Sequence, residues 1–148
     1  MRLALVRWAM KALIVRDLMT PRVFSVGPTD TLSDVWEIME QYHIRHVPVV
    51  DDEGRVVGLV SNRDLVRAAL HDDLDLPVTE RQNLLGTLKV QEAMVRGVET
   101  VTPETSIQEA GEMMLENKFS CLPVTEVQGR GLVGIMTEAD FVRYVVNL

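Results

Sequence analysis

The chain contains two copies of one sequence pattern, and the copies lie 75 positions apart. The following pairs keep this spacing: Val15 with Val90, Val26 with Val101, Pro28 with Pro103, Met39 with Met114, Pro48 with Pro123, and Gly54 with Gly129. One inserted residue near Gly131 raises the spacing to 76, so that Gly58 matches Gly134 and Asp64 matches Asp140. Self-similarity of this length is the signature of a duplicated structural unit, so both copies must adopt the same fold.

Each copy shows the pattern of strand, helix, strand, strand and helix. In the first copy we expect these elements at residues 23–26, from 32 onward, at 47–50, at 56–60 and from 61 onward. Thr31 with Asp34, and Ser106 with Glu109, form capping boxes that begin the first helix of each copy. A polar turn joins the two later strands into a hairpin. The predicted fold class is therefore α+β (α/β-like), with two β-α-β-β-α repeats.

The two copies are expected to fold together. A single copy of about sixty residues is close to the lower limit for independent folding, because so short a chain buries little of its surface. The hydrophobic content of 47% is enough for a shared core. We therefore expect the repeats to pack sheet to sheet with pseudo-two-fold symmetry. The chain then divides into an N-terminal amphipathic helix at 1–14, the first repeat at 15–70, a linker at 71–89 and the second repeat at 90–148.

The N-terminal stretch is basic and apolar. Its apolar residues that can share one helical face are Leu3, Val6, Met10 and Leu13. They predict a short helix that packs on the body of the protein or on a partner subunit. Charged residues interrupt the hydrophobic stretch, so it does not have the pattern of a signal peptide. It is also too short and too charged to span a bilayer. A helix anchored on a membrane surface is the less favoured alternative, and Met10 is an alternative start. In the linker we expect at most a helical turn near 80–85.

Charge and residue content exclude several classes of function. The net charge of −7 repels a phosphate backbone, so we expect no nucleic-acid partner. Cys121 is the only cysteine and reads as a buried apolar residue rather than a reactive thiol. His43 and His46, three positions apart in an extended segment, have no third ligand beside them, so we expect no metal. The sequence has no nucleophile elbow and no zinc-protease motif, so we expect no enzyme and no required cofactor. The single cysteine is ordinary for a reducing compartment, so we expect a place in the cytoplasm.

The repeat resembles the CBS domain in its element order and in two motifs. The first motif is the apolar-Pro-Val strand at 47–49 and 122–124; the second is Gly-apolar-apolar-Ser/Thr-x-x-Asp at 58–64 and 134–140. Two such repeats in tandem resemble a Bateman module. The resemblance implies a stand-alone regulatory protein that binds AMP, ADP, ATP or S-adenosylmethionine in clefts between the repeats. It also implies a homodimer that reports ligand occupancy to a regulated protein.

The Ser/Thr-x-x-Asp motif has two readings. Ser61 with Asp64, and Thr137 with Asp140, are ordinary arrangements for the start of a helix. The motif also places a helix N-terminus at a sheet edge, where backbone amides favour an anion. By resemblance to the family, the aspartate binds the ribose hydroxyls and the Ser or Thr lies beside the nucleotide. A purely structural dimerisation module is the alternative function.

The resemblance also assigns a phosphate subsite and a base pocket. Arg45 and His46 lie just before the first Val-Pro-Val strand, in the place where basic residues of relatives contact phosphate, and Arg63 lies inside the first motif. The second copy has Ser120 and Cys121 at the equivalent place, so we expect unequal sites, with the better one at Asp64. The residues expected around adenine are Val23, Val47 and Leu59 in one slot, and Val98, Leu122 and Ile135 in the other.

Overall fold

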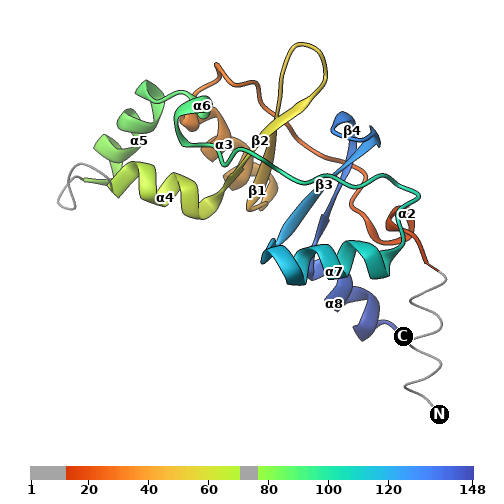
Figure 1. Cartoon of the computed structure of the whole chain (residues 1–148). Coiled ribbons are helices and arrows are strands. Elements are labelled where there is room, and N and C mark those ends of the chain that lie inside the picture. The colour runs from red at the N-terminus through yellow and green to blue at the C-terminus, as the bar shows by residue number, and fades with distance from the viewer. Residues whose placement is uncertain (1–12, 71–76) are drawn as a thin grey trace. The chain divides into compact units, whose positions relative to one another are not determined.

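The computed structural model describes residues 13–70 and 77–148, and it consists of two compact units. Unit 1 contains Met1–Val23 and Glu99–Leu148, and unit 2 contains Phe24–Val98. Each unit is described by itself. The helix expected at residues 1–14 lies almost wholly outside the described residues. Each unit contains helices and one small two-stranded antiparallel sheet, so the α+β class is confirmed (Figure 1).

Unit 2 is built on one hairpin with helices packed against it. Its elements are α3 (Leu32–Tyr42), β1 (His46–Val50), β2 (Val56–Ser61), α4 (Asn62–Leu70), α5 (Val78–Thr87) and α6 (Val90–Ala93). The predicted capping box begins α3, since Thr31 Oγ1 accepts a hydrogen bond from Asp34 N–H at 3.3 Å and Asp34 Oδ2 accepts one from Thr31 N–H at 3.0 Å. Apolar residues at helical spacing in α3, together with Leu65 of α4, share one buried core with β1 and β2.

Unit 1 repeats this plan. Its elements are α2 (Val15–Leu18), α7 (Ile107–Asn117), β3 (Cys121–Val127), β4 (Arg130–Thr137) and α8 (Glu138–Val146). Ser106 Oγ accepts a hydrogen bond from Glu109 N–H at 3.1 Å and begins α7 as expected. The core of the unit contains Ile107, Ala110 and Met114 from α7 together with Leu122 and Val124 from β3.

The segment that opens each repeat packs with the other repeat. Val15 at the start of the first repeat is fully buried in the core of unit 1, and its N–H donates to the carbonyl of Thr105 at 2.8 Å. Val90 at the start of the second repeat is fully buried in unit 2, and its N–H donates to the backbone carbonyl of Asp30 at 2.8 Å. The structural units therefore cut across the sequence repeats, and each unit needs residues from both.

The first strand expected in each repeat is reduced to one bridging residue. Val26 N–H donates to the Pro48 carbonyl at 3.1 Å and the Val26 carbonyl accepts from Val50 N–H at 2.8 Å, so it pairs in parallel with β1. Val101 forms the same bridge beside Val124. The prediction of a full strand at 23–26 was wrong, since Val26 alone of these residues bridges to β1, and Pro28, which has no N–H, prevents the ladder from extending past it.

The linker contains a ten-residue helix, α5, where the sequence predicted only one turn. Its sequence is largely polar and lacks a strong apolar stripe, which is why the periodicity underestimates it. Leu85 nevertheless lies in the core of unit 2 with 4% of its surface exposed, and α5 packs against both α3 and α4 (Figure 1). Tertiary packing through this leucine stabilises a helix that local sequence barely favours.

Candidate functional site

Asp64 is the centre of the candidate site in unit 2. Its Oδ2 accepts hydrogen bonds from Ser61 N–H at 2.7 Å and from the Ser61 hydroxyl at 2.9 Å, while Ser61 Oγ accepts from Asp64 N–H at 3.3 Å. Asp64 as a whole is 9% exposed. The helix-start reading of the motif is thus confirmed, and it uses one of the two carboxylate oxygens.

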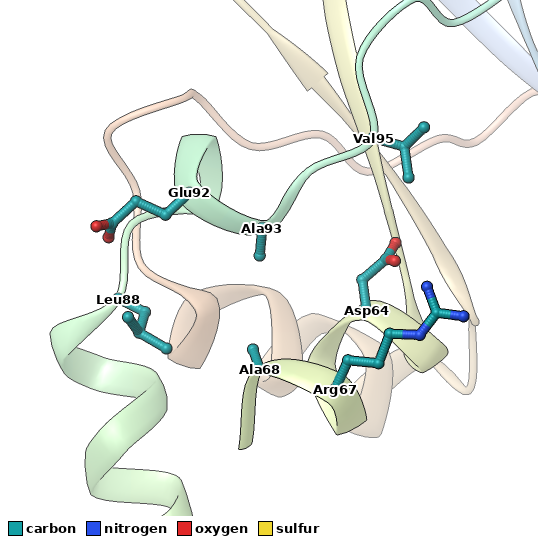
Figure 2. Close-up of a pocket in the computed structure, with 7 residues that line it drawn as sticks. All are labelled: Asp64, Arg67, Ala68, Leu88, Glu92, Ala93 and Val95. Atoms are coloured by element: carbon teal, nitrogen blue, oxygen red, sulfur yellow. The ribbon is translucent and has the colours of Figure 1, made fainter. Parts of the chain in front are cut away.

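Asp64 also lines a cavity of about 420 Å³. The residues that line the cavity are Asp64, Arg67, Ala68, Leu88, Glu92, Ala93 and Val95. Within residues 13–70 and 77–148, no hydrogen-bond donor reaches Asp64 Oδ1. Figure 2 shows the Asp64 carboxylate pointing toward Val95, with the guanidinium of Arg67 on the same side of α4. A buried carboxylate oxygen that still needs donors is suited to accept hydroxyl groups of a ligand.

The three basic residues expected at a phosphate lie around the start of α4. His46 pairs with Ser61 across the hairpin, and the backbone carbonyl of Arg45 accepts from Asn62 N–H at 2.9 Å. The side chains of Arg45 and Arg63 are exposed. The fold therefore brings the predicted ribose and phosphate residues of the first repeat to one helix N-terminus, where the dipole favours negative charge.

Asp140, the equivalent of Asp64 in unit 1, has both carboxylate oxygens occupied. Its Oδ2 accepts from Thr137 N–H at 2.8 Å and from the Thr137 hydroxyl at 3.2 Å. Its Oδ1 accepts from Arg143 Nη1 at 2.9 Å and, at 3.5 Å, from the hydroxyl of Thr20. Asp140 is 3% exposed. Arg67 has the same place after Asp64 as Arg143 has after Asp140, yet Arg67 lines the cavity and makes no ion pair with Asp64.

The six residues expected around adenine are divided between the units. Val23, Leu122 and Ile135 belong to unit 1, and Val47, Leu59 and Val98 belong to unit 2. Val47 and Leu122 are fully buried in their cores, whereas the other four are partly exposed. Two side chains with no exposed surface are core residues first, and the adenine role of the set stays a prediction.

Several residues of the cavity were missed from the sequence. Val95 forms two backbone hydrogen bonds with Leu59, at 2.9 and 3.0 Å, and so comes to lie beside the Asp64 carboxylate. The signal that points to Arg67 is its recurrence three positions after the aspartate in both repeats. No comparable signal exists for Glu92 or Ala93, because the second repeat supplies them to unit 2 through the exchange of opening segments.

Cys121 takes the place of His46 in unit 1, opposite Thr137. It is 4% exposed, and burial, with a smaller contribution from the negative charge of Asp140, raises the pKa of its thiol from 9.0 to about 12. This supports the reading of Cys121 as a buried apolar residue, since the thiolate is the nucleophile.

We expect native Cys121 to resist alkylation. At pH 8 its thiolate fraction should be about a thousandfold below that of an ordinary thiol, and its contribution to stability should be lost as the pH rises from about 9 toward 12. Iodoacetamide labelling followed by mass spectrometry measures this, with the urea-unfolded chain as the control. Equal labelling rates in the folded and unfolded chains would show that the thiol is not held protonated.

The described part of the chain holds no candidate metal centre and no candidate membrane-spanning helix. No group of three or more His, Cys, Asp or Glu side chains in it could hold a metal ion. His43 ends α3 in the left-handed conformation, with φ 54°, and its side chain is exposed. No helix among these residues is long and apolar enough to cross a membrane.

Comparison with known proteins gives a consistent family. The model of the CBS domain matches residues 15–71 and 90–147. A 17.7 kDa protein of Acidianus ambivalens is 30% identical over 134 residues, which cover 90% of this chain and 74% of the relative. The match covers between 20% and 92% of the length of the curated relatives, so the matched region also occurs within longer proteins.

Two solved structures share the fold. CBSX2 of Arabidopsis thaliana, solved in complex with AMP, is 30% identical with a TM-score of 0.73, and the match covers 92% of this chain and 98% of that one. The CBS domain of a CBS domain-containing membrane protein from Sphaerobacter thermophilus is 28% identical with a TM-score of 0.78, and the match covers 96% of this chain and 93% of that one.

Proposed function

Because this chain belongs to the CBS domain family, as a tandem pair of CBS domains, we propose that it is a regulatory module that binds an adenosine-containing nucleotide at Asp64. The single observation that carries the proposal is the half-occupied carboxylate of Asp64 at the edge of the unit 2 cavity. The AMP complex of CBSX2, a relative of the same fold, supports the choice of ligand class.

The chemistry of the site fits this ligand class. A carboxylate with an unused oxygen can accept hydrogen bonds from the hydroxyls of a ribose, which are charge-assisted and about 1.5–3 kcal/mol each. We propose Arg45, Arg63 and Arg67 as the cations for a phosphate group; Arg67 lines the cavity, and Arg45 and Arg63 are exposed near the start of α4. They matter because the net charge of −7 would otherwise repel an anion from the whole surface.

The two sites of the module are unequal. At Asp140, a ligand hydroxyl must displace Arg143 and Thr20 from Oδ1 before it can bind the carboxylate. At Asp64, a ligand hydroxyl can bind Oδ1 without displacing a hydrogen-bond donor of the described residues, because Ser61 donates to Oδ2. We therefore assign the ligand first to Asp64 with Ser61, and treat Asp140 with Thr137 as a second, weaker site.

Binding reaches a partner only if the ligand favours one conformation of the module over another. We propose that the module works as a cytoplasmic homodimer that passes nucleotide occupancy to a regulated protein, without catalysing a reaction itself. The alternative is a structural dimerisation module whose cavity has no nucleotide ligand.

Thermal unfolding in the presence of ATP, ADP, AMP and S-adenosylmethionine separates these two functions. A ligand present at 100 times its Kd should stabilise the folded chain by about 2.7 kcal/mol, which raises the melting temperature by several degrees. Adenine and inorganic phosphate, added separately, are the controls for nonspecific effects. No rise with any of the four ligands would refute the nucleotide function, and a dimer in sedimentation would then favour the structural alternative.

A further inference from the structure

Asp140 and Asp64 have the same backbone surroundings in their two units. Thr20 N–H donates to the Ile135 carbonyl at 2.9 Å and Ile135 N–H donates back at 3.0 Å, which places Thr20 beside Asp140 in unit 1. Val95 makes the same pair of backbone bonds with β2 of unit 2, at 2.9 and 3.0 Å. The backbone around the two aspartates is therefore alike, and the difference between the two sites lies in their side chains.

The arginine three positions after each aspartate takes a different place in the two units. In unit 1, Arg143 Nη1 donates to Asp140 Oδ1 at 2.9 Å, and the side chains of this ion pair are 65% and 1% exposed, respectively. In unit 2, Arg67 lines the cavity together with Asp64 and makes no ion pair within the described residues. The same two residues thus occur in a closed arrangement, with the ion pair formed, and in an open arrangement without it.

Unit 1 has few basic residues where unit 2 has several. Arg143, the equivalent of Arg67, is the one basic residue at the four unit 1 positions that correspond to the basic residues proposed around Asp64. The other three positions carry no cation: Ser120, Cys121 and Ala139 take the places of Arg45, His46 and Arg63. Of these four positions, the one that can offer a cation to a phosphate group is also the one that closes the carboxylate of Asp140.

A buried carboxylate loses a charged partner at a cost in free energy. Ribose hydroxyls can replace Arg143 and Thr20 as donors to Asp140 Oδ1, but they bring no positive charge to compensate the carboxylate. A ligand that also carries a phosphate offers the released guanidinium a new anionic partner, which arginine can bind through two parallel hydrogen bonds. The exchange is therefore favoured when the hydroxyls and the phosphate belong to one ligand.

We propose that Arg143 makes the Asp140 site selective for ligands that carry both ribose hydroxyls and a phosphate, because Arg143 leaves Asp140 and binds the phosphate in the same step. Thr20 supports the closed arrangement through its hydroxyl, 3.5 Å from Asp140 Oδ1. The Asp64 site has no such requirement, since Arg67 is already unpaired among the described residues. Because this selectivity concerns the second site of the proposed module, it rests on the proposed function.

Calorimetric titration of the Asp64→Ala variant measures the Asp140 site by itself. In this background we expect AMP to bind at least about tenfold more tightly than adenosine, the difference of one charge-assisted contact. Arg143→Met keeps most of the apolar stem of the side chain and removes its charge. It should strengthen the binding of adenosine by about tenfold and bring the two Kd values to within about threefold of each other. Arg143→Lys keeps the charge and should retain the preference for AMP.

Arg67→Met in the Asp140→Ala background is the matched control in unit 2. Arg67 does not hold Asp64 closed, so its loss should weaken the binding of AMP without strengthening that of adenosine. A cooperative thermal transition shows that each variant is folded, and Asp64→Asn replaces Asp64→Ala as the background if the alanine variant lacks one.

Failure of this selectivity can be told apart from failure of the proposed function. If neither AMP nor adenosine binds the unmodified chain, the proposed function is refuted and the selectivity with it. If AMP binds the unmodified chain but not the Asp64→Ala variant, only the selectivity of the Asp140 site is overturned. The same holds if Arg143→Met leaves the ratio of the Kd values of adenosine and AMP unchanged, because Arg143 then does not choose the ligand.

Discussion

Asp64→Ala should abolish the rise in melting temperature that an adenosine nucleotide produces, whereas Asp140→Ala should leave most of that rise in place. Asp64 lines the cavity and uses only Oδ2 in its hydrogen bonds with Ser61, while both oxygens of Asp140 are engaged by residues of unit 1. The loss at Asp64 should equal the whole ligand effect, about 2.7 kcal/mol at 100 times the Kd. Differential scanning fluorimetry with and without AMP or ATP measures both variants.

Each substitution also removes a helix cap, so the unliganded chain must be measured as well. Loss of a cap costs about 0.5–2 kcal/mol. Asp140→Ala should cost more than Asp64→Ala without ligand, because it also releases Arg143 and Thr20. Asp34→Ala is the matched control, since it breaks the same kind of cap at α3 and Asp34 does not line the cavity. Equal losses of the ligand effect at Asp64 and Asp140 would contradict the inequality of the sites.

The sequence predicted the elements that depend on local chemistry. The capping residues Thr31 and Ser106 begin their helices, and the hairpins run where the apolar runs and polar turns placed them. Local chemistry does not determine which unit the opening segment of each repeat packs into. Val15 and Val90 occupy equivalent positions in the two repeats, and each packs into the core formed mainly by the other repeat. A repeat alignment is unchanged by such an exchange, so it cannot reveal it.

The candidate site was predictable only in part for the same reason. The Ser/Thr-x-x-Asp motif located Asp64 and Asp140, and the expectation of unequal sites rested on Arg45 and His46. The structure adds a second inequality, because Thr20 contacts Asp140 while its equivalent, Val95, has no hydroxyl to give Asp64. The difference between Thr20 and Val95 indicates unequal sites only when the structure shows that each lies beside the aspartate of its unit.

Gly58→Val should destabilise the chain by about 1–3 kcal/mol, because the core at this point has no room for a side chain. A Cβ built on Gly58 would overlap Met94 Sδ and lie 2.8 Å from Met94 Cγ. Met94 is 9% exposed and ends α6, the opening segment of the second repeat, against β2 of the first. Gly58 therefore allows α6, the opening segment of the second repeat, to pack closely against β2 in unit 2. Urea unfolding at pH 7 measures the change in the free energy of unfolding.

A double-mutant cycle with Met94→Ala attributes the effect to this contact. Met94→Ala alone should cost about 2–5 kcal/mol by leaving a cavity. In that background the added valine can occupy part of the space, so Gly58→Val should cost less by about 0.5–3 kcal/mol. Gly86→Ala, where nothing lies within 4 Å of the new Cβ, should instead stabilise α5 by about 0.5–1 kcal/mol. If the cost of Gly58→Val is the same with and without the Met94 side chain, the close approach of α6 to β2 is not what requires the glycine.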